Sequence, residues 1–254
     1  MHSDGQIRNY YETLYRAWGR QHWWPAQSPF EVIVGAYLTQ NTSWTNVERA
    51  LASLRQARIL SVRGIRRTPT AKLECLIRSA GYFRQKAQRL KTFVRFLDAR
   101  YAGSLTRMFA QPTGKLREEL LALNGVGPET ADSILLYAGN HSVFVVDAYT
   151  RRILERHQIL PAKAAYEEIR ELFERSLSPL EKPLESGPAL VTNTAVPSGT
   201  SHSPSRVSTA ARSPQAQVFN EMHGLIVGVG KNFCKKSQPE CERCPLQKFL
   251  SKAE

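Results

Sequence analysis

The stretch LNGVGPETA, residues 123–131, has the residue types of a turn that binds an anion. Gly125 and Gly127 flank Val126, a proline follows, and Thr130 opens an apolar-periodic run. Such a turn leaves backbone N–H groups pointing outward, and the following helix adds the positive end of its dipole. The pattern predicts a site for one DNA phosphate, because glycines allow the phosphate to approach closely. An ordinary helix–helix turn with a C-cap glycine is the alternative.

The charge of the chain favours a polyanionic partner. Lys and Arg outnumber Asp and Glu by 13, and a basic surplus of this size attracts phosphates through counterion release. A protein that positive charge keeps soluble is the alternative. No apolar run reaches the roughly 18–20 residues that span a membrane, and the N-terminal segment lacks the apolar core of a secretion signal. We therefore expect a cytoplasmic monomer with no membrane contact, associated with the nucleoid if the source is prokaryotic.

Most of the chain has helical hydrophobic periodicity. A capping box, Ser28–Glu31, with proline at the first helical position, begins one predicted helix. Further helical faces are predicted near 44–54, 73–80, 87–97, 116–121, 131–138, 148–157, 162–176 and 215–228. Only SVFVV, residues 142–146, has strand-like composition, and five residues make no sheet. The predicted fold class is all-α.

Residues 178–215 differ from the rest of the chain. They are rich in Pro, Ser, Thr and Ala and show no helical period. Because such a segment buries too little apolar surface to offset its ordering entropy, we predict a disordered insertion between two helices. A partner-binding motif is the alternative.

A second motif, HSVFVVDAYTRRIL, places Asp147 after a short apolar segment and before a helix, 18 residues beyond Glu129. Together with the turn, it resembles the helix-hairpin-helix DNA glycosylases of the endonuclease III superfamily. Their hairpin L-x-G-V-G-x-x-T-A matches residues 123–131, and their V-D-x-x-x-x-R matches the segment from Val146 to Arg152. The likeness extends to LTQNTSWTNVERAL, GYFRQKA and the C-terminal cysteines, and so covers most of the chain outside the predicted insertion.

This resemblance implies a two-domain fold. A six-helix barrel carrying the hairpin would occupy residues 28–140. The segments 1–27 and 141–254 would form a second helical domain with a C-terminal cysteine loop. Double-stranded DNA with a damaged base would lie across the cleft between them, with the hairpin and Asp147 at its mouth.

The resemblance also implies an activity, with Asp147 as the catalytic residue. In the lyase branch of the superfamily, a lysine at the position of Glu129 attacks C1′ of the sugar and forms a Schiff base. A carboxylate cannot do so, and a monofunctional base-excision glycosylase is therefore expected. Asp147 would stabilise the oxocarbenium-like sugar and orient a water for attack on C1′. For Glu129 itself, a first-turn residue that complements the helix dipole is the simplest role.

Excision in a duplex requires the nucleotide to be turned out of the stack. By the family match, Gln40 would enter the gap and Tyr82 would wedge against the opposite strand. A helix-end polar residue and a surface aromatic are the respective alternatives. The expected DNA-binding set also contains Gly125, Val126, Gly127, Thr130 and Lys231.

The adjacent tryptophans Trp23 and Trp24, with Trp44 further on, are the predicted base pocket. Electron-poor N-alkylated purines stack well on indole rings. WWP, LTQNT and a hairpin without lysine resemble the endonuclease-III-related 3-methyladenine DNA glycosylases, which implies an alkylated purine as substrate. A tryptophan in the core and another at the domain interface is the alternative. Removal of mismatched, deaminated or oxidised bases, or a DNA-binding module without catalysis, are the alternative functions.

The cysteines Cys234, Cys241 and Cys244 follow the spacing C-x6-C-x2-C. Iron–sulfur members of the superfamily have a fourth cysteine after five intervening residues, and four thiolates hold a 4Fe–4S cluster. Here that position is Leu250, so the set is incomplete. A cluster with three protein thiolates and an outside ligand, a loop without metal, and a three-thiolate zinc site all remain open.

Overall fold

A computed structural model describes residues 2–178, 180 and 204–250 of the chain. Every regular element in this part is helical, which confirms the predicted all-α fold class. None of these helices combines the length and the apolar character that a membrane crossing requires. The chain divides into two compact units, Ala26–Gly139 and Met1–Pro25 with Asn140–Glu254. We call them the hairpin unit and the Asp147 unit; the boundaries predicted at 28 and 140 lie two residues and one residue away.

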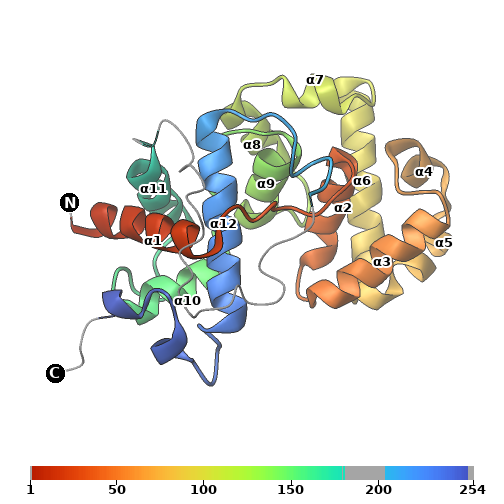
Figure 1. Cartoon of the computed structure of the whole chain (residues 1–254). Coiled ribbons are helices and arrows are strands. Elements are labelled where there is room, and N and C mark those ends of the chain that lie inside the picture. Colours follow the sequence, from red (N-terminus) through yellow and green to blue (C-terminus); the bar gives the residue numbers. More distant parts are fainter. Residues whose placement is uncertain (1, 179, 181–203, 251–254) are drawn as a thin grey trace. The chain divides into compact units, whose positions relative to one another are not determined.

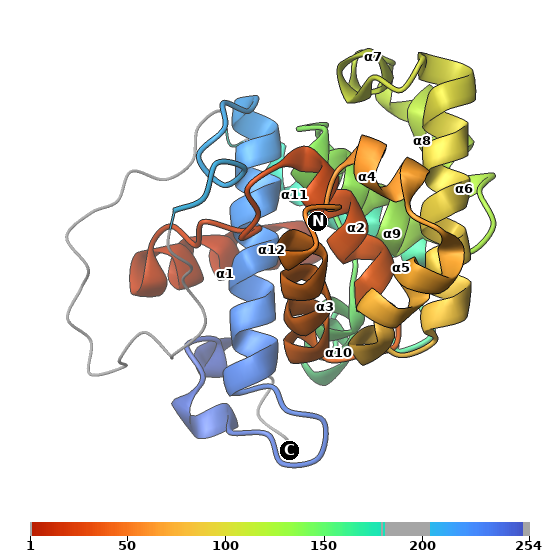
Figure 2. The ribbon, with the colours of Figure 1, turned by 90° about the vertical axis from the view of Figure 1, so that its right-hand side faces the viewer.

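The hairpin unit is built around α2 (Figure 2). Its elements are α2 (Pro29–Thr39), α3 (Trp44–Gln56), α4 (Val62–Arg67), α5 (Thr70–Leu76), η1 (Arg78–Ala80), α6 (Phe83–Tyr101), α7 (Leu105–Phe109), α8 (Thr113–Leu121), α9 (Pro128–Ser133) and the π-helical η2 (Ile134–Ala138). Ser28 begins α2 by accepting a hydrogen bond from the Glu31 amide, and residues 30–38 are all buried. A helix that is apolar on all sides belongs in a core, and α2 packs against α3, α6, α9 and η2.

A buried lysine joins three elements of the hairpin unit. Lys86 of α6 is 1% exposed, and its Nζ donates to the carbonyls of Leu38 at 2.9 Å and Ala80 at 2.8 Å. These carbonyls lie at the end of α2 and at the end of η1, where helices leave acceptors without partners in the helix. Burial lowers the pKa of Lys86 to about 8, and Arg89 adds to this shift. The ammonium group therefore acts as a cap for two helix ends at once.

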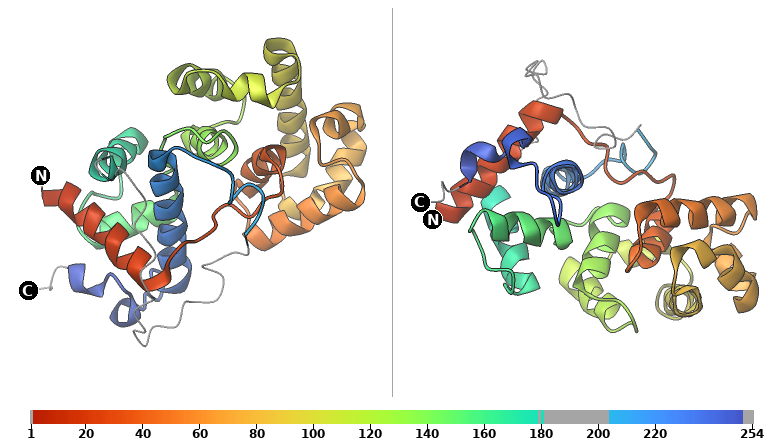
Figure 3. Two further views of the ribbon diagram at one scale, coloured as in Figure 1. Left: turned by 45° about the horizontal axis from the view of Figure 1, so that its top comes forward. Right: turned by 90° about the horizontal axis from the view of Figure 1, so that it is seen from below.

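The Asp147 unit is built around α12 (Pro214–Asn232), which packs against α1 (His2–Trp18), α10 (Ala148–Arg156) and α11 (Tyr166–Leu177) (Figures 1 and 3). The turns η3 (Cys241–Arg243) and η4 (Gln247–Phe249) follow it. Gly230 of α12 lies against the ring of Tyr149, and a Cβ at this glycine would overlap the ring. The glycine thus lets α10 approach α12 closely, directly beside the residue that precedes α10, Asp147.

The structure describes only part of the predicted disordered insertion at 178–215. Residues 179 and 181–203 lie outside the described residues, whereas 204–213 are described and contain a turn at 206–209. The Ser205 amide donates to Ser208 Oγ at 2.8 Å, and the Ser208 amide donates to Ser205 Oγ at 3.1 Å. Ser213 then caps α12, which begins at Pro214. These serines satisfy backbone groups by local side-chain bonds, a source of order that the missing helical period does not reveal.

We predict that Lys86→Met lowers the unfolding free energy by about 2–3 kcal/mol, because two buried carbonyls lose their charged partner. Urea denaturation followed by circular dichroism measures the change. Lys72→Met is the matched control, since Lys72 is an exposed lysine of the same unit, on α5. Its effect should stay within about 0.5 kcal/mol. Equal midpoints for the two variants would show that Lys86 caps neither helix end.

Candidate functional site

The predicted hairpin is present between α8 and α9, which pack against each other. Gly125 has φ +79°, a left-handed conformation that favours glycine, and a Cβ there would overlap the Arg89 side chain. Val126 is 7% exposed, so this side chain anchors the turn and does not face a partner. Gly127 precedes the first turn of α9, whose amides have no acceptor within the helix. The backbone of the hairpin therefore has the form of an anion site.

Gln40 lies at the C-terminal end of α2, where its side chain bonds to the hairpin. Its Nε2 donates to the Gly125 carbonyl at 2.9 Å and to Thr130 Oγ1 at 3.0 Å. Its Oε1 accepts from Arg89 Nη1 at 2.7 Å. The amide thus ties α2, α6 and the hairpin together. If Gln40 enters the space left by a flipped-out nucleotide, as predicted, its side chain must break these three hydrogen bonds and form others.

Arg89 was not singled out by the sequence analysis. It is one of several basic residues between 84 and 91, and no spacing distinguishes it. The Arg89 side chain donates to Gln40 and lies against Gly125. Both contacts depend on how α6 packs, so they are visible only in the folded unit.

Two aromatic candidates of the hairpin unit have accessible surface. Tyr82 precedes α6 in a left-handed conformation and is 65% exposed. Single exposed apolar side chains are common on protein surfaces, so the exposure shows only that the Tyr82 ring is accessible to a partner. Trp44 is the first residue of α3, is partly exposed, and donates from Nε1 to Glu48 at 2.9 Å. Glu129 lies in the first turn of α9, where its charge complements the helix dipole.

Asp147 is the N-cap residue of α10 in the other unit. Its Oδ1 accepts from the Thr150 amide at 2.8 Å and from Thr150 Oγ1 at 2.9 Å. Its Oδ2 lies 3.6 Å from His223 Nε2, and the Asp147 side chain is 13% exposed. Both bonds and the positive end of α10 stabilise a negative charge here. The sequence pattern Asp-x-x-Thr carries the local signal for this cap, whereas His223 has no local signal.

Two arginines that follow Asp147 are directed to backbone carbonyls. Arg151 Nη1 donates to the Ala164 carbonyl at 2.7 Å. Arg152, which matches the arginine of the resemblance motif, donates from Nε to the Cys234 carbonyl at 2.6 Å. Within the described part of the chain, no Lys or Arg forms an ion pair with Asp147. The carboxylate is thus held by a helix cap and not by an ion pair with a Lys or Arg of the described residues.

The tandem tryptophans of the same unit differ in exposure. Trp24 is 6% exposed, whereas Trp23 is half-buried. The Trp23 ring centroid lies 5.9 Å from that of His223, and Lys231 Nζ lies 5.9 Å from the Trp23 ring centroid. The Trp23 carbonyl accepts from Asn220 Nδ2 at 2.6 Å. Three residues of α12 therefore hold Trp23, and Trp23 offers more ring surface than Trp24.

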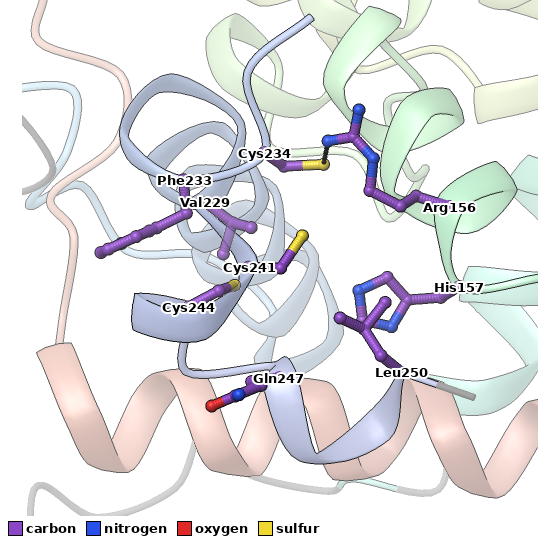
Figure 4. A pocket seen from close by; sticks show the side chains of 9 residues that line it. All are labelled: Arg156, His157, Val229, Phe233, Cys234, Cys241, Cys244, Gln247 and Leu250. Carbon is purple, nitrogen blue, oxygen red and sulfur yellow. Dashed lines mark hydrogen bonds between the residues drawn. The ribbon is translucent and has the colours of Figure 1, made fainter. Parts of the chain in front are cut away.

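The three cysteines line a small pocket in the Asp147 unit (Figure 4). Its lining consists of Arg156, His157, Val229, Phe233, Cys234, Cys241, Cys244, Gln247 and Leu250. Cys234 Sγ accepts a hydrogen bond from Arg156 Nη1 at 3.1 Å. Burial raises the pKa of Cys244 to about 11. The pocket volume is about 10 Å³, the space of about one water molecule.

This donor set does not fit a four-thiolate cluster. Leu250 offers no ligand atom where a fourth thiolate is needed. Within the described residues, no group of three or more His, Cys, Asp or Glu side chains is arranged to hold a metal ion. The neighbouring His157 bonds to the Tyr10 hydroxyl at 2.6 Å through Nδ1, and burial lowers its pKa to about 4. No chemistry is therefore assigned to a metal here.

Comparisons with known proteins give one family. The model of the HhH-GPD superfamily of base excision DNA repair proteins matches residues 34–179. A candidate DNA repair glycosylase of Methanocaldococcus jannaschii is 41% identical over 249 residues, which cover 97% of this chain and 96% of the relative. Endonuclease III of Thermotoga maritima is 25% identical over 219 residues, which cover 86% and 81% of the two chains.

Solved structures show the same fold. A 3-methyladenine DNA glycosylase of H. pylori, bound to 1,N6-ethenoadenine, matches with TM-score 0.67 and 28% identity, covering 90% of this chain and 97% of that one. A non-covalent endonuclease III–DNA complex matches with TM-score 0.69 and 20% identity, covering 97% and 94%. The second likeness concerns the fold alone.

We predict that Gln40→Leu loosens the hairpin, because the Gly125 carbonyl and the Arg89 guanidinium lose their partner. The loss corresponds to about 1–3 kcal/mol of local stability. Hydrogen exchange of the amides at 124–130 should quicken accordingly. Gln85→Leu, at an exposed position of α6, is the control and should leave these amides unchanged. Unchanged exchange in the Gln40 variant would show that the Gln40 side-chain amide does not hold the hairpin in place.

Proposed function

Because the chain belongs to the HhH-GPD superfamily of base excision DNA repair proteins, we propose that it is a monofunctional glycosylase that removes alkylated purines from duplex DNA. The membership confirms the resemblance that the hairpin and the Asp147 motif indicated. It makes the chain a base-excision DNA glycosylase with DNA as its partner. The lesion class and the absence of strand cleavage are the parts that the proposal adds.

The observation that carries the proposal is the setting of Asp147. A carboxylate that stabilises a developing positive charge has to remain an anion and keep its orientation. The two bonds from Thr150 meet both needs through one oxygen, Oδ1. No cation within the described residues neutralises the charge. This setting suits stabilisation of an oxocarbenium-like sugar.

The proposed reaction is hydrolysis of one bond. The C1′–N bond of the flipped-out nucleotide breaks, and its electron pair leaves with the base. Charge develops at C1′, where Asp147 stabilises it. The oxygen of a water molecule bonds to C1′, and its proton passes to the Asp147 carboxylate and then to solvent. The products are a free base and an intact strand with an abasic site.

Glu129 supports the assignment of a glycosylase without lyase action. A lyase needs an amine that attacks C1′ and forms a Schiff base, and a carboxylate at this position of α9 offers none. The hairpin that carries Glu129 would contact a phosphate through the backbone from Gly125 to Thr130. Lys231, exposed at the end of α12, and Tyr82 would add further DNA contacts.

The accessible tryptophans support an alkylated purine as the substrate. Trp23 and Trp44 have ring surface for stacking, and cationic purines bind indole faces through charge and dispersion. The likeness to a 3-methyladenine DNA glycosylase at 28% identity points the same way. Trp24 is buried and offers less surface for stacking than Trp23.

We expect alkali-dependent breaks in a duplex that carries one alkylated adenine. The duplex is incubated with the protein, divided into untreated and hot-alkali samples, and strand lengths are read. Intact strands before alkali and breaks after it indicate base release without lyase action. Duplexes with a uracil mismatch, an oxidised base or no lesion serve as controls.

The same assay can also give results that contradict the proposed function. Breaks without alkali would show a lyase and refute the role given to Glu129. Breaks in the uracil or oxidised duplex alone would replace the lesion class. Tight binding with no break on any duplex would identify a DNA-binding module.

We predict that Trp23→Ala and Trp44→Ala each slow excision of alkylated adenine by about 5- to 150-fold, since stacking of a base on an aromatic ring contributes about 1–3 kcal/mol. The measurement is the single-turnover rate at saturating protein. Trp24→Ala is the comparison, because its buried ring should affect thermal stability more than rate. Wild-type rates for Trp23→Ala and Trp44→Ala would remove the aromatic pocket from the account.

A further inference from the structure

His223 is a buried titratable residue that the proposed reaction does not use. It lies on α12, is 4% exposed, and faces Asp147 across the contact of α12 with α10. Its Nε2 is 3.6 Å from Asp147 Oδ2. Protonation of a buried histidine is unfavourable. Position 223 lies on the buried side of α12, where an apolar side chain would fit the hydrophobic pattern.

Phe144, Trp23 and Asp147 lie close to the imidazole. The Phe144 ring meets it edge to face at 6.3 Å between centroids, and the Trp23 ring lies at 5.9 Å. Asp147 is the charged group that acts on it: burial lowers the pKa of His223, and the Asp147 carboxylate opposes that shift. The net direction is downward, so the imidazole is neutral at neutral pH. A neutral imidazole next to the carboxylate leaves its negative charge in place.

The carboxylate is thus fixed from two sides. Thr150 holds Oδ1 with two hydrogen bonds, and His223 lies against Oδ2. The same imidazole also meets the half-buried ring of Trp23. One side chain of α12 therefore contacts both the proposed catalytic group and a proposed base-stacking group.

We propose that His223 is a positioning residue for base excision, because it holds Asp147 Oδ2 and the Trp23 ring in one fixed arrangement. The inference rests on the proposed function of Asp147. It differs from that function in that His223 acts through Asp147 and Trp23. Its Nε2 lies 3.6 Å from Oδ2, a polar contact longer than a hydrogen bond, and its ring limits the rotation of the carboxylate away from C1′. Fixed orientation of a charged group before reaction is a large part of electrostatic catalysis.

Three variants of His223 test this role. Gln places an N–H donor near the position of Nε2, Asn is too short to do so, and Leu fills the space without a donor. We expect His223→Gln to keep the single-turnover rate on the alkylated duplex within about 3-fold of wild type. His223→Asn and His223→Leu should lose about 10- to 100-fold, since a misplacement of a reacting group by about 1 Å can cost about 100-fold. DNA affinity should stay unchanged in all three.

His157→Gln is the matched control. His157 is also a buried histidine of the Asp147 unit, with a lowered pKa, but it bonds to Tyr10 and not to Asp147. If His157→Gln lost as much rate as His223→Asn and His223→Leu, the loss would indicate general destabilisation and overturn the inference. Thermal midpoints are measured for every variant, and if His223→Leu fails to fold, the contrast between Gln and Asn decides.

A double-variant cycle separates this inference from the proposed function. If His223 acts through Asp147 and Trp23, His223→Asn should cost nothing further in a background that carries both Asp147→Asn and Trp23→Ala. An additional 10- to 100-fold loss in that background would overturn the inference. Full excision by Asp147→Asn alone would refute the proposed function instead. Loss by Asp147→Asn together with wild-type rates for both His223→Asn and His223→Leu would overturn the inference and leave the proposed function standing.

Discussion

A carboxylate that is mostly removed from water has to keep its charge, and the Asp147 unit is organised around this constraint. Burial of an anion costs several kcal/mol unless polar groups replace the lost hydration. Here a helix N-terminus and the Thr150 side chain replace it at Oδ1. An arginine partner would be a stronger stabiliser but would offset the negative charge. Arg151 and Arg152 are engaged with backbone carbonyls instead.

The arrangement around Asp147 also depends on α12. Its glycines let other elements approach: Gly230 admits the Tyr149 ring, and Gly224 lies against the tryptophan segment, where a Cβ would be 3.1 Å from that of Trp23. Bulkier residues at these positions would push α10 and Trp23 away from the helix. In the hairpin unit, side chains hold the turn in place. The Gln40 side-chain amide donates to the Gly125 carbonyl and to Thr130 Oγ1, which would otherwise need water as a partner, and Arg89 donates to Gln40.

Local signals in the sequence predict much of this. The glycine turn, the serine and proline that begin α2, and the threonine three residues after Asp147 each act within a few residues, so their effect is visible without the fold. The helix α1 was not predicted, although its buried residues follow a helical period: Ile7, Tyr10, Tyr11, Leu14, Tyr15 and Trp18. Periodicity does not predict α4 or α7, which have only six and five residues, too few for a period. The order in 204–213 is likewise hidden, because serine side-chain bonds produce it.

The contacts that connect distant segments were beyond sequence reasoning. His223 meets Asp147, and Arg89 meets Gln40, only because whole helices pack in one way. The exposure of the tandem tryptophans depends on the same packing and distinguishes Trp23 from Trp24. For the cysteines, the sequence already shows an incomplete set at Leu250 and leaves a cluster, a loop without metal and a zinc site open, whereas the Arg156 contact to Cys234 depends on the packing.

The central claim is that the charge of Asp147 drives excision. The most direct test is the single-turnover rate of Asp147→Asn on a duplex with one alkylated adenine, measured beside DNA affinity. The account predicts a loss of about 100-fold or more, in line with removal of a group that stabilises the transition state, with affinity equal to or above that of the wild type. An unchanged rate would contradict it, because the reaction would then proceed without the anion around which the unit is built.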